Sequence, residues 1–108
     1  MLEVWIDGNT KGCSMDIELL DIGENKWFNK PRTVLEGKWE GLLLTLEFLS
    51  QKGWFDNSII LYINSKRMAK WYEKAPKTAN LHAYYGVCIV LWREFEDIKM
   101  KYRYARKV

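Results

Sequence analysis

The stretch Val4-Trp5-Ile6-Asp7 ends in a carboxylate placed where it could take part in chemistry. Three β-prone apolar residues lead into Asp7 and the chain then turns through Gly8-Asn9, so a buried strand would deliver one acid to the end of a sheet. The alternative is an Asp-Gly turn after an ordinary strand. Two later features favour a site: Glu40 in the opening turns of a predicted helix, and a second predicted strand that ends in Asn64-Ser65.

Three strands are expected to come first among the elements that position these side chains. Residues 2–6 form the first, and alternating apolar and acidic residues predict the second over about 13–22. A hairpin turn is predicted at 23–26, and a short third strand should begin at 27–28 and be limited by Pro31. The opening of the chain is therefore expected to form an antiparallel meander.

The rest of the chain is expected to alternate helices and strands. Thr33 is a predicted N-cap with Glu36 as its capping-box partner, and helical spacing continues to about residue 51 before Gly53 ends the helix. The apolar run 58–63 predicts a strand covered on both faces, parallel to the first and beside it. Two further helices, from 64–65 to 76 and from 80 to 95, and a last strand with basic residues on its outer side complete the order.

Composition indicates one ordinary globular domain, which we expect to span residues 1–108. No apolar run approaches the roughly 20 residues needed to cross a bilayer, and the N-terminus lacks a signal-peptide pattern. Cys13 and Cys88 fit neither a CxxC site nor a disulfide framework, and a single histidine leaves no zinc set. We therefore expect reduced thiols and a cytoplasmic location.

Positive charge is concentrated at the end of the chain. Five of the 17 basic residues, and no acid, lie in the last ten positions, which leaves 12 basic and 14 acidic groups in residues 1–98. This asymmetry suggests an anionic partner, whereas the alternative is that the basic side chains only prevent edge-to-edge pairing of an edge strand. The predicted phosphate contacts are Lys99, Lys101, Arg103, Arg106 and Lys107, with Arg32, Lys66 and Arg67 near the presumed site.

The order β-β-β-α-β-α-α-β is that of the ribonuclease H fold, and several motifs resemble that family. Val4-Trp5-Ile6-Asp7-Gly8-Asn9 resembles its first strand, which ends in a catalytic aspartate, and Trp39-Glu40-Gly41-Leu42-Leu43 resembles the helix start that carries its catalytic glutamate. The stretch 59–65 resembles a strand that normally ends Thr-Asp-Ser, and Asn80-Leu81 and 98–102 resemble a later helix start and the last strand. The resemblance covers nearly the whole chain. It implies an α/β fold with a five-stranded mixed sheet in the order 3-2-1-4-5, strands 1–3 antiparallel, and helices packed on it, but no C-terminal helix.

The resemblance also implies a nuclease that cuts the RNA of RNA/DNA hybrids with two Mg²⁺ ions held by four acids. Asn64 stands at the third of these positions, and the sequence ends before the helix that would carry the fourth, so Asp7 and Glu40 are the implied metal ligands. Two ions about 4 Å apart bring four positive charges, which two carboxylates and a phosphate do not easily neutralise. We therefore expect at most one Mg²⁺ or Mn²⁺, weakly bound.

Several of these assignments have alternatives that the sequence leaves open. Glu36 is a rival of Glu40, and either glutamate could act only on the helix macrodipole. Asn64 could be an N-cap or an engineered replacement for aspartate. His82 is interpreted as a surface residue. The tryptophans are expected in the core or half-buried, although one exposed ring could stack on a base; they are Trp27, Trp54, Trp71 and Trp92.

The favoured hypothesis for function is a nucleic-acid-associated domain with a degenerate metal site, which binds or scaffolds an RNA/DNA hybrid or duplex rather than cleaving it. One alternative is a metal-dependent endonuclease of ribonuclease H type that acts on hybrid. Another is a protein–protein interaction module, with a second copy or another protein as partner. Without the family's last helix, part of the sheet should stay open, bordered by rings such as Trp5 or Tyr104, which favours self-association or an obligate partner.

Overall fold

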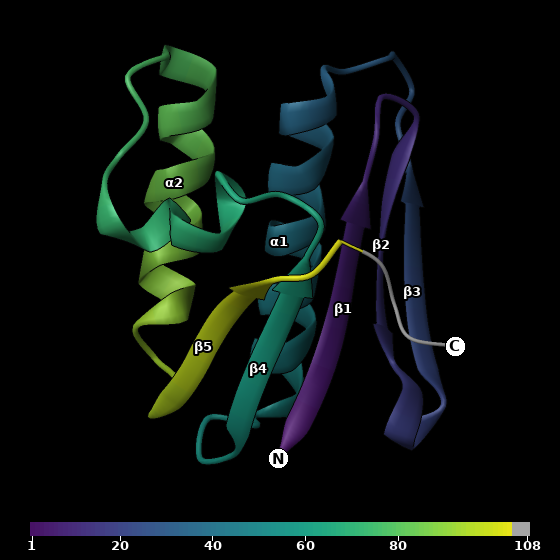
Figure 1. Ribbon diagram of the computed structural model, residues 1–108, viewed down its shortest axis with the longest axis vertical. Helices are drawn as coiled ribbons and strands as arrows, with labels where there is room; N and C mark the ends of the chain where they lie inside the picture. Colours follow the sequence, from purple (N-terminus) through teal and green to yellow (C-terminus); the bar gives the residue numbers. More distant parts are fainter. Residues whose placement is uncertain (105–108) are drawn as a thin grey trace.

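A computed structural model describes residues 1–104 and forms a five-stranded mixed sheet in the order β3-β2-β1-β4-β5 (Figure 1). The strands are β1 (Leu2–Gly8), β2 (Gly12–Ile17), β3 (Ile22–Trp27), β4 (Ser58–Ile63) and β5 (Asp97–Tyr102). β1 pairs antiparallel with β2 and parallel with β4, β2 pairs antiparallel with β3, and β4 pairs parallel with β5. The expected strand order and directions are confirmed.

The turn between β2 and β3 lies earlier in the chain than the sequence pattern predicts. β2 ends at Ile17, and a 3-10 turn (η1, Glu18–Leu20) leads to Ile22, which pairs with Ile17. The predicted strand over 13–22 and hairpin at 23–26 are therefore wrong, because residues 23–26 lie inside β3. Asp21 reverses the chain with a left-handed backbone (φ 53°). Leu19 continues the apolar alternation in the sequence, but it is 81% exposed and does not belong to the strand.

Helix α1 (Val34–Lys52) begins and ends where the sequence predicts. The Thr33 hydroxyl accepts a hydrogen bond from the Glu36 N–H, and the Glu36 carboxylate accepts one from the Thr33 N–H, which completes the capping box. Gly53 ends the helix with φ 71°, a conformation that favours glycine. This helix is thus fixed at both ends by local chemistry.

Two glycines of α1 let the helix rest directly on the end of β1. A Cβ at Gly37 would clash with the Asn9 carbonyl oxygen, and one at Gly41 would lie 2.8 Å from the Asp7 carbonyl oxygen. Larger side chains would push the helix away from the strand. The close approach brings the backbone of α1 to the residue that the sequence singles out for chemistry.

The second half of the helical layer is less regular than expected. The predicted helix after β4 is a 3-10 helix, η2 (Met68–Glu73), and α2 (Ala79–Trp92) has Thr78 rather than Asn80 as its N-cap. α2 packs against α1, and η2 contacts β4 and β5. No helix within residues 1–104 is long and apolar enough to cross a membrane.

The two faces of the sheet differ in what covers them. α1 lies behind β1 and β4 in Figure 1, whereas the chain from the end of β5 to residue 104 passes in front of the end of β4. Residues such as Ile6, Ile17 and Leu61 face α1 and are buried in the core. Because side chains alternate along a strand, their neighbours point to the other side, which we call the open face. It includes Glu3, Trp5, Asp7, Ser14, Asp16, Asn25, Trp27, Ile60, Tyr62, Lys99 and Lys101.

Candidate functional site

Asp7 lies near the carboxyl end of β1 and is exposed on the open face. One carboxylate oxygen accepts a hydrogen bond from the Gly8 N–H at 2.8 Å. The following turn is held by Asn9, whose side-chain oxygen accepts from the N–H groups of Lys11 (2.8 Å) and Gly12 (3.1 Å). Asn9, and not Asp7, therefore holds the turn together, and the Asp7 carboxylate faces solvent.

Asn64 lies next to Asp7, because β4 runs parallel to β1 and ends beside it. Both residues line a small pocket of about 160 Å³ whose walls also include Trp5, Tyr62 and Arg103. Of Asn64 and Ser65, the two predicted caps of the next helix, Ser65 accepts a hydrogen bond from the Met68 N–H at 3.1 Å through its hydroxyl, although the N-cap of η2 is Arg67. Asp7, Asn64 and Arg103 therefore form one corner of the open face, which we call the Asp7 corner.

Glu40 lies on the helix-covered side and is only 6% exposed. One carboxylate oxygen lies 3.1 Å from the Lys26 Nζ; the other accepts a 2.6 Å hydrogen bond from the Tyr84 hydroxyl and lies 3.7 Å from the Arg32 guanidinium. Arg32 also donates to the Tyr84 oxygen at 2.9 Å. We call these four residues the Glu40 cluster; it ties β3, the segment before α1, α1 and α2 together.

The electrostatics of the Glu40 cluster favour a permanently charged carboxylate. Burial raises the pKa of Glu40, but the hydrogen bonds from Tyr84 and Lys26, with the charges of Lys26 and Arg32, outweigh it and hold this pKa below its ordinary value. Burial, and then the Glu40 charge, raise the pKa of the Cys13 thiol to about 11. The Glu40 carboxylate is thus engaged by hydrogen bonds and ion pairs within the fold.

The rival glutamate, Glu36, is also engaged locally. Besides the capping box, its carboxylate accepts a hydrogen bond from the Asn80 side chain at 2.8 Å. The backbone hydrogen bond at Thr33 is the first cause that lowers the pKa of Glu36, followed by the contact with Asn80. Glu36 therefore anchors the start of α1 and the start of α2.

The structure brings Asp7 and Asn64 together and turns the Glu40 carboxylate toward a different set of partners. Within residues 1–104, no group of three or more His, Cys, Asp or Glu side chains is arranged to hold a metal ion. One carboxylate and one amide at the Asp7 corner do not fit a resident pair of Mg²⁺ ions, which need several anionic oxygens. A single weakly held divalent cation is the most that this donor set suits.

The basic residues that were predicted to contact phosphates lie in different parts of the structure. The Arg103 guanidinium lies 4.9 Å from the centre of the Tyr62 ring, at the Asp7 corner, and the Lys66 Nζ lies 5.6 Å from that of Tyr102. Lys99 and Lys101 are exposed on the open face. Arg67 lines a separate pocket in the helical layer. The remaining two predicted contacts, Arg106 and Lys107, lie outside the described residues.

An exposed tryptophan agrees with the alternative that one ring is free to stack on a base, but the sequence pattern did not indicate which one. Trp27 was expected to be buried or half-buried, but it is 78% exposed, and it lines a second depression with Asp7 and Asn25. The exposure of Trp27 follows from the register of β3 on β2. Side chains alternate along β3, so Trp27 points to the open face when Lys26 points to the covered side. This register can be predicted only if the β2–β3 turn is placed correctly. Tyr104, expected beside an open area of the sheet, is also 78% exposed, whereas Trp5 is half-buried and stacked on Tyr62 at 4.7 Å.

Solved structures share this architecture at low sequence identity. RNase H1 from the halophilic archaeon Halobacterium salinarum NRC-1 is 15% identical, with a TM-score of 0.73 over 94% of this chain and 84% of that chain. LC11-RNase H1 in complex with an RNA/DNA hybrid is 14% identical, with a TM-score of 0.77 over 95% and 85%. The N-terminal RNase H domain of a Mycobacterium tuberculosis protein is 15% identical, with a TM-score of 0.77 over 94% and 86%.

These similarities rest on structure alone. No protein-family model matches the sequence, and no curated protein matches it either. The structural matches cover most of both chains, and the strand order and directions agree with the resemblance seen in the motifs around Asp7, Glu40 and Asn64. The chain therefore has a ribonuclease H-like fold.

Proposed function

We propose that this chain is a nucleic-acid-associated domain that binds an RNA/DNA hybrid or duplex through its open face and does not cleave it at an ordinary enzyme rate. The observation that carries the proposal is the separation of the two acids. Asp7 is exposed beside Asn64, whereas the Glu40 carboxylate is held by Lys26, Arg32 and Tyr84.

Binding is supported by the cations and rings around the Asp7 corner. Arg103 lies at the corner, and Lys99 and Lys101 are exposed on the same face. Lysine and arginine side chains contact phosphates and release counterions, while exposed rings such as Trp27 and Tyr104 offer stacking surfaces for bases. One structural neighbour, LC11-RNase H1, was solved in complex with an RNA/DNA hybrid. The cations on and just after β5 favour a partner that carries phosphates, whereas most acids of this face belong to β1 and β2.

The proposed lack of efficient cleavage follows from the contacts that hold the Glu40 carboxylate away from the Asp7 corner. Moving this carboxylate to a metal ion at the Asp7 corner would break its contacts with Lys26 and Tyr84 and leave the half-buried Tyr84 hydroxyl without its acceptor, which is costly. Without it, Asp7 supplies one negative charge and Asn64 none. The degenerate site then holds at most one Mg²⁺ or Mn²⁺ weakly, and two-metal phosphoryl transfer lacks its ligands.

The test measures binding and cleavage of an RNA/DNA hybrid by the same preparation. The protein should bind at low salt, and replacing Lys99, Lys101 and Arg103 with Gln should weaken binding and flatten its salt dependence by up to about three units of slope. A control triple replacement of equal charge, Lys52→Gln, Lys70→Gln and Arg93→Gln, should change binding far less. With Mg²⁺ or Mn²⁺, no turnover near the usual range of about 1–10³ per second is expected.

The alternatives make different predictions in this assay. Rapid metal-dependent cleavage that is abolished by Asp7→Asn would make the chain a hybrid endonuclease. Undetectable binding at low salt, or equal binding by both triple variants, would remove the nucleic-acid role. A protein–protein module would then be the remaining hypothesis, to be tested by the mass of the particle in solution.

A further inference from the structure

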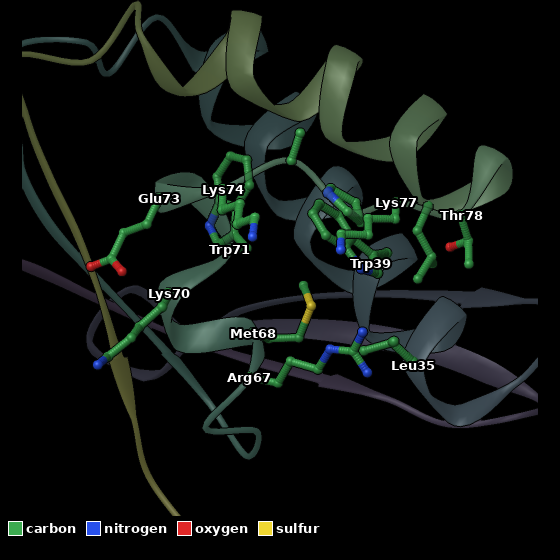
Figure 2. A pocket seen from close by; sticks show the side chains of 13 residues that line it. Leu35, Trp39, Arg67, Met68, Lys70, Trp71, Glu73, Lys74, Lys77 and Thr78 are labelled. Carbon is green, nitrogen blue, oxygen red and sulfur yellow. The ribbon is translucent and has the colours of Figure 1, made fainter.

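A pocket of about 450 Å³ lies in the helical layer, between the start of α1, η2 and the segment that leads into α2 (Figure 2). Most of its wall is apolar and comes from Leu35, Trp39, Met68, Trp71 and Leu81. Its volume falls within the range of about 300–1,000 Å³ typical of small-molecule sites. The pocket is separate from the Asp7 corner, so an inference from it does not rest on the proposed function.

Basic side chains surround this apolar wall. Figure 2 shows Lys77 beside Trp39, Arg67 between Met68 and Leu35, and Lys74 beside Trp71, all of them part of the lining. Residues 66–78 contain five basic residues and one acid. That acid, Glu73, extends away from Trp39 in Figure 2. The mouth of the pocket is therefore positively charged, and its interior is apolar.

Hydrogen-bond donors at the pocket, like its basic side chains, favour a ligand that carries oxygen acceptors. Thr78, part of the lining, is the N-cap of α2, yet its side chain makes no capping hydrogen bond, and the acid that lies at this helix start, Glu36 of α1, accepts from the Asn80 side chain. The first N–H groups of a helix carry partial positive charge and seek acceptors. In addition, the indole nitrogen of Trp71 is a buried polar atom with no hydrogen-bond partner among the described residues. An oxygen-bearing ligand can satisfy such donors.

We propose that this pocket binds a small organic anion: an apolar body against Trp39, Met68 and Leu81, with a carboxylate or phosphate head near Lys74, Lys77 and Thr78. The apolar wall alone would accept any apolar molecule of suitable size. The basic mouth selects among them, because a cationic head would meet like charges and a neutral head would gain no ion pair. An inorganic anion, in turn, lacks the apolar body that fills the volume.

The experiment is a calorimetric titration of the full chain with three probes that separate these contributions. Decanoate supplies an apolar body with a carboxylate, decylamine supplies the same body with a cation, and inorganic phosphate supplies charge without a body. Decanoate should bind at least tenfold more tightly than decylamine, and phosphate should bind more weakly than decanoate. Equal binding of decanoate and decylamine, or phosphate binding as tight as decanoate, would overturn the proposal.

Variants then locate the site. Replacing Lys74 and Lys77 with Gln should weaken decanoate binding by about two- to thirtyfold, the range for two partly exposed ion pairs. A control with the same charge loss, Lys99→Gln and Lys101→Gln, should leave decanoate binding unchanged. Ala75→Trp, which places a ring in the pocket, should abolish it while the circular-dichroism spectrum stays that of the folded protein. Undiminished binding by both the lysine and the Ala75 variants would show that decanoate binds elsewhere and overturn the assignment.

Discussion

Asp7 and Glu40 are both carboxylates near the contact between β1 and α1, yet their surroundings are opposite. Asp7 is exposed in a pocket that it shares with Asn64, and its carboxylate accepts a hydrogen bond from the neighbouring Gly8 N–H. Glu40 is almost completely buried and contacts two cations and a tyrosine hydroxyl. The close packing of Gly41 on the Asp7 carbonyl brings the two backbones together, while the side chains leave toward different faces.

This difference shows how the fold decides the use of an acid. A buried carboxylate must be neutralised by charge and hydrogen bonds, so Glu40 stabilises the packing of β3 and α2 on α1. An exposed carboxylate has no such requirement and stays available to a ligand. The Glu40 cluster is thus a structural unit, and the Asp7 corner is the place where a partner is expected.

The largest expected effect is on stability and comes from the Glu40 cluster. Glu40→Ala should lower the free energy of unfolding by about 2–3 kcal/mol, because it leaves the half-buried Tyr84 hydroxyl and two cations without their acceptor. This figure stays below that for a fully buried pair, since Lys26 and Arg32 are 49% and 39% exposed. Asp7→Ala should change stability by about 0.5 kcal/mol or less. Urea unfolding of both variants measures the contrast, and equal losses would contradict it.

How much of this contrast the sequence predicts depends on the range of the interactions. The capping box at Thr33 and the ending at Gly53 are local signals, and the crossover rule places Asn64 beside Asp7, so these features follow from sequence. The partners of Glu40 do not. Lys26 and Tyr84 lie 14 and 44 residues away, and no local pattern joins them to Glu40 before the fold is known. The same holds for Trp27, whose exposure depends on a turn fixed by the backbone of Asp21.

A smaller effect is expected from adding a charge at the Asp7 corner. Asn64→Asp would place two carboxylates in one pocket, where they should bind Mn²⁺ more tightly than the parent does. A metal concentration of ten times Kd stabilises the native state by about 1.4 kcal/mol, or roughly 5–10 °C in Tm for a domain of this size. Thermal-shift titrations of parent and variant measure this difference.

Two controls connect this result to the comparison. Asp7→Asn in the same background should remove the added shift, whereas Glu40→Gln, although less stable, should keep it. Equal shifts in the parent and the Asn64→Asp variant would mean that Asn64 is not part of a metal site. A shift lost in the Glu40→Gln background would mean that the two acids act together after all.

The pH dependence of stability should also separate the two acids, by a smaller amount. Since the pKa of Glu40 is lowered in the folded protein, its contribution is present above its unfolded pKa of about 4.5 and is lost as pH falls through the folded value. Glu36 has the same direction, so the quantity to measure is the difference in unfolding free energy between the wild type and Glu40→Gln. This difference should be constant from pH 6 to 8 and shrink below about pH 4.5. A constant difference down to pH 3 would mean that Glu40 contributes only through its shape.

The smallest expected effect concerns Asp7 and has opposite signs with and without metal. In the absence of divalent ions, the Asp7 carboxylate repels a phosphate bound near Arg103, by a few tenths of a kcal/mol after screening by water and salt. Asp7→Asn should then tighten hybrid binding about twofold in a buffer with a chelator. With Mn²⁺ present, the same carboxylate can hold the ion against a phosphate, so the replacement should weaken binding instead.

Glu40→Gln is the matched control. The charge of Glu40 is already neutralised by Lys26 and Arg32, so the effect of this replacement on hybrid binding should not change sign with metal. Fluorescence anisotropy with a labelled hybrid measures both conditions, and an Asp7→Asn effect of the same sign in chelator and in Mn²⁺ would show that Asp7 does not face the bound phosphate.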